Sequence, residues 1–428
     1  NVIFDGNSFN GSSQTVTLDV STPTCSNMTW TGVTNNPSFN GNNNTLKIYG
    51  SLTFVTGMTV TNNTHLSFEA TTTGKTITTA GRVFGNITLN GIGGGWTLQD
   101  AINSASTSIS LNNGSFNTNN QTLTIGSFSS DNGNTRSMTM GSTVMNLSGD
   151  WVGRTTVGFT LSAGTSTINL TDGRFYHGEG ANHLTYYDVN FVPTGNNRAQ
   201  LYPYSGQATY HNLTTSTGFD RWGSGGGMIT VTNNFTCPKD YIGYWGGILN
   251  VNGTATIGGS ATFDDAINIG TLNLTGAGAT YTFSSGKTAT ITTALNITGG
   301  NCGAFTNIYS SSVGSVATIS MASGSTTANY VNLKDITATG GANFNATNTI
   351  DQGNNTGWNI TALSSRNLYW IGRTGNWSNG NNWSLSSGGA ALGCAPTSLD
   401  NVIFDGNSFN ASGQTVTLDI STPTCSNM

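Results

Sequence analysis

The chain has 428 residues, of which only 7% are charged, and its formal net charge is −5. Globular domains usually carry about 25% charged residues, and here the 58 Gly, with abundant Asn, Thr and Ser, take their place. The 13 Lys and Arg are scattered singly, which excludes the basic face that a nucleic-acid partner needs, and no polybasic run or long apolar stretch predicts contact with a membrane.

Short segments of alternating apolar and polar residues recur along the chain, and they predict β-strands. In chain order these segments are Thr45–Phe54, Lys75–Thr79, Asn86–Leu89, Ser108–Leu111, Gln121–Gly126, Ser166–Leu170, Met228–Phe235, Thr271–Leu274, Thr288–Thr292 and Ala317–Met321. Long helices are not expected, because Thr, Asn, Ser and Gly form helices poorly. Disorder is not expected either, because 35% of the residues are hydrophobic and they alternate.

Many short polar strands fit either a row of β-sandwiches or a parallel β-helix, that is, a β-solenoid. The turns are rich in Asn and Gly and nearly free of Pro, which suits the tight corners of a solenoid. Stacked coils place equivalent residues about 4.8 Å apart, a spacing at which like charges repel but Asn, Ser and Thr form hydrogen-bonded ladders. The sequence therefore predicts an all-β parallel β-helix, with roughly 16–20 coils in 400 residues at about 4.8 Å each.

The segment Asn401–Met428 repeats Asn1–Met28 at an offset of 400 residues. Three of the 28 positions differ (Gly11/Ala411, Ser13/Gly413 and Val20/Ile420), so 28 − 3 = 25 are identical. We expect one 400-residue unit of a tandem array, with a solenoid body over residues 1–363, a joint over 364–400 and the start of the next unit over 401–428. Adjacent repeats of the same chain are then the first expected partners.

Three tryptophans mark the expected joint. Trp370, Trp377 and Trp383 lie close together in LYWIGRTGNWSNGNNWS, and indoles that bury large apolar areas can hold a connection between two modules. Packing at the joint is the preferred interpretation, and a stacking platform for sugars is the alternative.

Seven phrases of the sequence carry a resemblance to known proteins: YWIGRTGNWSNGNNWS (Tyr369–Ser384), DNVIFD (Asp400–Asp405), CSNMTWTGVTNNP (Cys25–Pro37), IYGSLTF (Ile48–Phe54), GKTITTAG (Gly74–Gly81), GGGWTLQD (Gly93–Asp100) and GNNTGWNI (Gly353–Ile360). At these phrases the sequence resembles the giant repetitive surface adhesins of Bacteroidota-type bacteria, whose modules are similar to autotransporter and haemagglutinin passengers. The resemblance implies secretion and display on a bacterial cell surface. It implies no catalytic residues.

The cysteines offer disulfides but no zinc site. Cys425 is the repeat copy of Cys25, so one unit holds four cysteines, and no CxxC occurs. In an extracellular chain we expect Cys394–Cys425 across the joint, with Cys237–Cys302 as a weaker second pairing. Small buried thiols are the alternative.

Parallel β-helices include polysaccharide-degrading enzymes, so the most polar region of the chain is a candidate ligand site. It spans Asp172–Asp188 and is followed by His211 and Asp220. Its candidate residues are Asp172, Arg174, His177, Glu179, His183 and Asp188. The two histidines do not match HExxH, and the preferred interpretation is that these residues decorate coils. No catalytic residue and no cofactor is expected, although adventitious Ca²⁺ would be compatible.

We therefore predict a non-enzymatic, extracellular structural repeat that forms a stalk or filament for adhesion. Lateral copies of the chain, surface glycans and host or neighbouring cells are the further expected partners. The first alternative is an array of carbohydrate-binding β-helical modules that uses Trp222, Tyr244 and Trp245. The second is a β-helical polysaccharide-degrading enzyme, which would need clustered carboxylates in a cleft.

Overall fold

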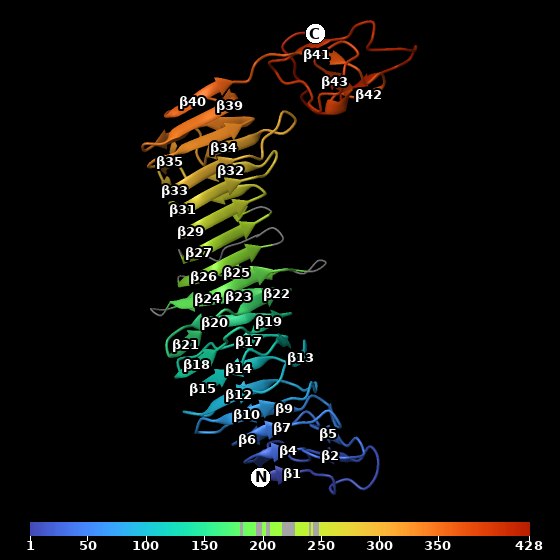
Figure 1. Ribbon diagram of the computed structural model, residues 1–428, viewed down its shortest axis with the longest axis vertical. Coiled ribbons are helices and arrows are strands. Elements are labelled where there is room, and N and C mark those ends of the chain that lie inside the picture. Colours follow the sequence, from blue (N-terminus) through green and yellow to red (C-terminus); the bar gives the residue numbers. More distant parts are fainter. Residues whose placement is uncertain (180–182, 194–198, 203–205, 216–226, 239–240, 243–247) are drawn as a thin grey trace. The chain divides into compact units, whose positions relative to one another are not determined.

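The computed structural model shows an all-β parallel β-solenoid of about 14 turns with only 1% helix, as the sequence predicts (Figure 1). It describes residues 1–179, 183–193, 199–202, 206–215, 227–238, 241–242 and 248–428. The chain forms two compact units, Asn1–Ala255 and Thr256–Met428.

The first unit is built from parallel sheets whose neighbouring strands come from successive turns. One sheet contains β1 (Val2–Ile3), β4 (Met28–Thr29), β7 (Leu52–Thr53), β10 (Lys75–Thr78), β12 (Gly95–Leu98), β15 (Gly114–Asn117), β18 (Arg136–Thr139) and β21 (Phe159–Ser162). A second contains β3 (Thr24–Cys25), β6 (Thr45–Ile48), β9 (His65–Phe68), β11 (Ile87–Leu89), β14 (Ile109–Leu111), β17 (Phe128–Ser129), β20 (Trp151–Thr155), β23 (Gly173–Glu179) and β25 (Ala199–Tyr202). A small third sheet contains β2 (Thr15–Thr17), β5 (Ser38–Asn40) and β8 (Thr59–Thr61).

Further strands of this unit form another side of the solenoid. They are β13 (Ile102–Ser104), β16 (Leu123–Ile125), β19 (Val144–Leu147), β22 (Thr167–Leu170), β24 (Leu184–Phe191), β26 (Gln207–Thr215), β27 (Met228–Cys237), β28 (Tyr241–Ile242) and β29 (Ile248–Ile257), in which the unit ends.

The second unit contains parallel solenoid strands, followed by a region of short strands and one 3-10 helix. Its solenoid strands are β30 (Ala261–Phe263), β31 (Ile267–Leu274), β32 (Thr280–Phe283), β33 (Thr288–Ile297), β34 (Thr306–Ser310), β35 (Ala317–Met321), β36 (Ser325–Asn329), β37 (Val331–Lys334), β38 (Ile336–Thr339), β39 (Asn343–Asp351) and β40 (Trp358–Ala362). The remaining elements are β41 (Asn367–Trp370), β42 (Gly375–Asn376), η1 (Gly380–Asn382), β43 (Trp383–Ser384), β44 (Asn401–Ile403) and β45 (Val416–Thr417). Ser364, where the predicted joint begins, lies in the gap between β40 and β41.

The core is a set of columns in which each inward side chain stacks on its register partner one turn away. One column of the second sheet contains Leu46, Leu66, Ile87, Ile109, Phe128, Trp151, Phe175 and Leu201, all buried. Within it the Trp151 and Phe175 rings are stacked, with centroids 5.5 Å apart. Because every turn buries its neighbours, stability comes from stacking rather than from one globular core.

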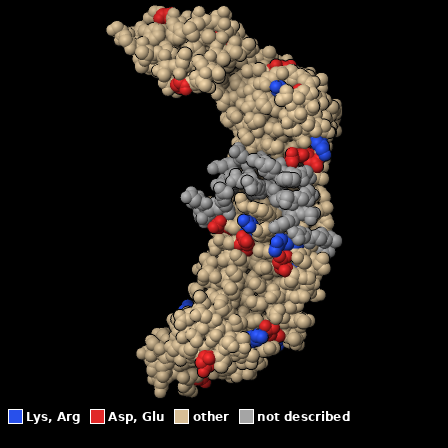
Figure 2. Space-filling view, turned by 180° about the vertical axis from the view of Figure 1, so that it is seen from behind, with Lys and Arg blue, Asp and Glu red and all other residues tan. Residues whose placement is uncertain are grey.

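Outward positions carry the predicted polar ladders. The Asn169 amide donates to Asn146 (2.9 Å) and accepts from Asn190 (3.0 Å), so one amide chain crosses three turns. Similar bonds join Asn296 to Asn273 (2.8 Å). Charges are few, and Figure 2 shows Lys and Arg in small groups beside Asp and Glu on a largely uncharged surface.

The number of turns is lower than the sequence estimate. Register partners are 98 − 77 = 21 residues apart at Ile77 and Leu98, but 318 − 288 = 30 apart at Thr288 and Thr318. The sequence estimate assumed coils of equal length throughout the 400 residues. Because some turns are longer and the segment after β40 is not solenoid, fewer turns form. The segment Thr45–Phe54, predicted as one strand, is two strands with a corner at Gly50, where a Cβ atom would lie 2.5 Å from the Ser26 carbonyl oxygen.

Candidate functional site

The segment after β40 folds onto the repeated sequence that follows it. The strand β41 pairs in parallel with β44, with Asn367 opposite Asn401, and antiparallel with β43. The short strand β42 pairs in parallel with β45, with Gly375 opposite Val416. We call residues 364–400 the joint segment. Its strands β41 and β42 pair with β44 and β45, the strands of the second copy.

The three tryptophans form the core of this region. Trp370, Trp377 and Trp383 are at most 2% exposed, and both neighbouring pairs meet edge to face with ring centroids 4.9 Å apart. The Trp383 indole donates to the Trp377 carbonyl oxygen (2.9 Å). Phe404 of the second copy packs on this cluster. Because the rings are buried, they cannot stack on a sugar in this conformation.

A buried ion pair closes the joint segment where it meets the second copy. Asp400 is fully buried and accepts from the Arg366 guanidinium (2.8 and 2.6 Å) and from the backbone amide and hydroxyl of Thr397 (2.8 and 2.9 Å). Burial alone would raise the pKa of Asp400, but these hydrogen bonds outweigh it and hold the pKa below its usual value. The sequence offered no signal for this pair beyond the DNVIFD phrase.

The disulfide differs from both predicted pairings. Cys302 is bonded to Cys394, with Cα atoms 5.4 Å apart, so neither Cys394–Cys425 nor Cys237–Cys302 forms. Cys25 and Cys425 are thiols. The two partners are 92 residues apart in sequence, and the prediction failed because it took the partner from the repeat pattern, whereas the bond depends on which turn of the solenoid carries a cysteine near the joint segment.

The two copies of the repeated sequence adopt the same local structure. The Asn27 amide donates to Asn1 (2.7 Å), and the Asn427 amide donates to Asn401 (2.7 Å). The amide of Asp5 donates to the Ser8 hydroxyl (2.9 Å), as Asp405 does to Ser408 (2.9 Å). The second copy therefore repeats local hydrogen bonds of the first, and the joint segment pairs with its strands β44 and β45.

The residues of the predicted polar patch do not converge on one point. His177 is fully buried and bonded to the Tyr210 hydroxyl (2.5 Å), whereas Arg174 is exposed and donates to the Tyr176 hydroxyl (2.8 Å). Asp172 is half-buried and His183 is exposed. The side chain of Glu179 and all of Asp220 lie outside the described residues.

Burial dominates the electrostatics of His177. It lowers the pKa of this imidazole to about 3 and raises that of Tyr210, so both groups are neutral at pH 7. Nearby on the outside, Asp188 accepts from the Asn212 amide (2.8 Å) and lies 3.2 Å from His211 Nδ1, while the His211 ring stacks on Tyr187 at 4.1 Å. Asp188 and His211, both named in the predicted polar region, therefore lie within ion-pair distance of each other.

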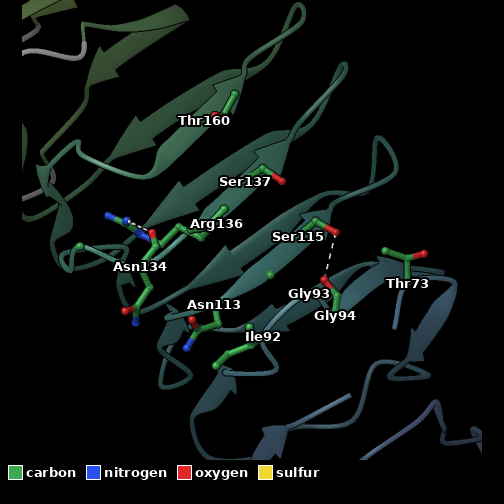
Figure 3. A pocket seen from close by; sticks show the side chains of 13 residues that line it. Thr73, Ile92, Gly93, Gly94, Asn113, Ser115, Asn134, Arg136, Ser137 and Thr160 are labelled. Carbon is green, nitrogen blue, oxygen red and sulfur yellow. Dashed lines mark hydrogen bonds between the residues drawn. The ribbon is translucent and has the colours of Figure 1, made fainter. Parts of the chain in front are cut away.

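A shallow groove runs over the outer face of β12, β15, β18 and β21 (Figure 3). It has a volume of about 750 Å³ and is lined by small polar side chains and glycines, together with Ile92 and Arg136. Ser115, Ser137 and Thr160 are register partners on successive strands, so their hydroxyls form a column across it. The Arg136 guanidinium is buried and fully bonded, to Ser130 and to backbone carbonyl oxygens including that of Asn134 (2.8 Å). No aromatic residue is among those lining the groove.

No family model matches the chain, and no curated protein or solved structure matches it either. In the described part of the chain, no helix has the length and hydropathy needed to cross a membrane. Within the same residues, no three His, Cys, Asp or Glu side chains gather where they could hold a metal ion. The sugar-platform candidates Trp222, Tyr244 and Trp245 lie outside the described residues.

Proposed function

We propose that this chain is a structural repeat of a long bacterial surface protein, in which solenoids joined in tandem form a stalk or filament for adhesion. The observation that carries the proposal is the second copy of the opening turn, folded like the first and covered by the joint segment. A chain that starts a new solenoid where the previous one ends is built to extend.

The proposal includes display outside the cell, no catalytic step and no cofactor. The sparse charge and the amide ladders support it, because a surface of Asn, Ser and Thr stays hydrated while its backbone groups are paired between turns. The disulfide is compatible with an oxidising compartment. The resemblance of the Tyr369–Ser384 phrase to repetitive adhesins agrees with this assignment.

Carbohydrate binding is the second candidate, and the groove across β12, β15, β18 and β21 is the observation that favours it. Its hydroxyl column and the neighbouring Asn113 and Asn134 could donate and accept hydrogen bonds from a saccharide. It offers no ring for stacking, so we expect weak binding at most.

Immunogold labelling of intact cells of the producing organism tests the proposal. Antibodies raised against this chain should label the outside of unpermeabilised cells, with gold at a distance from the envelope. Labelling only after permeabilisation would contradict the proposal. Retention of the chain on an immobilised saccharide, lost on Ser137→Trp, would instead favour the second candidate.

A further inference from the structure

The opening turn of the solenoid has an upstream face that is covered in one copy and bare in the other. In the second copy, the joint segment covers this face: the Asn401 amide donates to the Arg366 carbonyl oxygen (2.8 Å), and the amides of Gly375 and Trp377 donate to the carbonyl oxygens of Thr415 (3.0 Å) and Thr417 (2.8 Å). The backbone amide of Ser378 also donates to the Asp419 carboxylate (3.0 Å).

In the first copy, the same groups face outward. Among the described residues, β1 is the end strand of its sheet and pairs only with β4, and β2 is the end strand of its sheet and pairs only with β5. Ile3 is 64% exposed, whereas its equivalent Ile403 is half-buried. Asp19 and Asp419 are both exposed, and they differ in the bond that Asp419 accepts from Ser378.

Burial follows the same division. Ser408 is fully buried beside the joint segment, whereas its equivalent Ser8 is exposed. Phe9 behaves oppositely: it is 6% exposed beneath the Trp30 ring, and Phe409 is 37% exposed. The first copy thus has the following turn, with Trp30, on one side but no joint segment on the other. The second copy has the joint segment but no following turn.

The two copies are identical at every position where the joint segment forms a hydrogen bond or strand pair with the second copy, including those within 401–407 and 415–419. The three differing positions are Gly11, Ser13 and Val20, and none of their equivalents bonds to residues 364–400 in the second copy.

We propose that the upstream face of the opening turn, formed by Asn1–Asp5, Ser8 and the edge of β2 with Asp19, is a docking site for a second joint segment, supplied by a preceding repeat. The inference rests on the proposed tandem array. By equivalence, Asn367 of the incoming segment extends the ladder from Asn27 through Asn1, Leu368 covers Val2, and Ser378 binds Asp19.

The test is the full chain extended by a copy of residues 364–400 placed directly before Asn1. A scrambled extension of the same composition is the control for the extra length. Hydrogen exchange followed by mass spectrometry should show peptides within residues 1–20 exchanging about tenfold more slowly with the native extension than with the scrambled one. The three added tryptophans should also emit at shorter wavelength in the native extension, because they are buried only there.

Two substitutions in the extended chain sharpen the result. Asp19→Ala removes the acceptor for Ser378 and should speed exchange of this turn about threefold. Val20→Ile, the change that the second copy itself carries, should leave it unaltered. Equal exchange with the native and scrambled extensions would overturn the docking proposal. That result is independent of the cell-labelling experiment, which can fail or succeed whether or not the segment docks.

Discussion

At the scale of single residues, His177 is the clearest case of a polar group whose role the sequence could not assign. From the sequence, the polar residues around the two histidines are interpreted as decoration of coils, with a ligand site as the alternative. The alternation of β23 turns His177 inward, opposite Gly153, and His183 is exposed. Sequence spacing could not say which side chains of this region point into the core, because that depends on where the turn before β23 ends.

His177 should make stability depend on pH. Well above pH 6.5 the imidazole is neutral in both the folded and the unfolded chain, so it does not make the free energy of unfolding depend on pH. Between pH 6.5 and the folded pKa of about 3, the unfolded chain binds a proton that the folded chain excludes, so the free energy of unfolding falls by about 1.4 kcal/mol per pH unit. Denaturant unfolding at pH 7.5 and 5.0 should therefore show a loss of about 2 kcal/mol in the region around β23.

The control variants separate this effect from other titrations. His177→Gln should remove most of the difference between the two pH values, although the variant is less stable at both. His183→Gln should retain the full difference. A pH dependence unchanged by His177→Gln would show that the imidazole is already protonated or accessible in the folded chain.

The contribution of the buried Asp400 carboxylate to stability can also be tested. Asp400→Asn should destabilise the region of the joint segment by about 2–4 kcal/mol, because it leaves the Arg366 guanidinium, whose side chain is 16% exposed, without its charge partner. Denaturation followed by the fluorescence of the Trp370, Trp377 and Trp383 cluster measures this change. The double variant Arg366→Met, Asp400→Asn should recover part of the loss; no recovery would mean that the bonds from Thr397, rather than the charge pair, carry the stability.

At the scale of elements, alternation located a strand at each of the ten predicted segments. The predicted segments Ser166–Leu170 and Ala317–Met321 match β22 and β35 within one residue, because inward Ile and Leu alternate with outward Thr, Asn and Ser. The ladders followed from the same reasoning, since a fixed turn-to-turn spacing brings like side chains together. The disulfide and the length of individual turns did not follow, because both depend on loops that have no periodic pattern.

The Asn146–Asn169–Asn190 ladder should contribute measurably to the elements that it joins. Asn169→Asp at pH 7 replaces a donor to Asn146 with a charged acceptor, and we expect a loss of about 1–2 kcal/mol in unfolding free energy. The same substitution at Asn103, an exposed outward position of β13, is the matched control and should cost little. Thermal melts of both variants measure the difference, and a recovery of Asn169→Asp at pH 3 would follow from the protonated carboxyl donating again.

Equal melting temperatures of the two variants would mean that the amide ladder does not contribute to stability and that the inward columns alone hold the turns together.

At the scale of the whole molecule, the scarcity of charge predicts indifference to salt. The ion pairs among the described residues, such as Arg154 with Asp131 (2.7 Å) and Lys287 with Asp265 (2.7 Å), are few and local. The melting temperature should therefore change by no more than about 2 °C between about 20 mM and 1 M NaCl, since screening has little to act on. A shift of several degrees, measured by circular dichroism in a non-stabilising salt, would contradict the account of uncharged ladders.

The central claim is that the chain is one unit of a tandem array whose solenoids follow one another through joint segments. The most direct measurement is electron microscopy of chains that contain one, two and three consecutive 400-residue units. The account predicts particles whose longest dimension grows by the same step with each added unit. Particles that grow in all directions, or units that separate as beads on flexible strings, would contradict it.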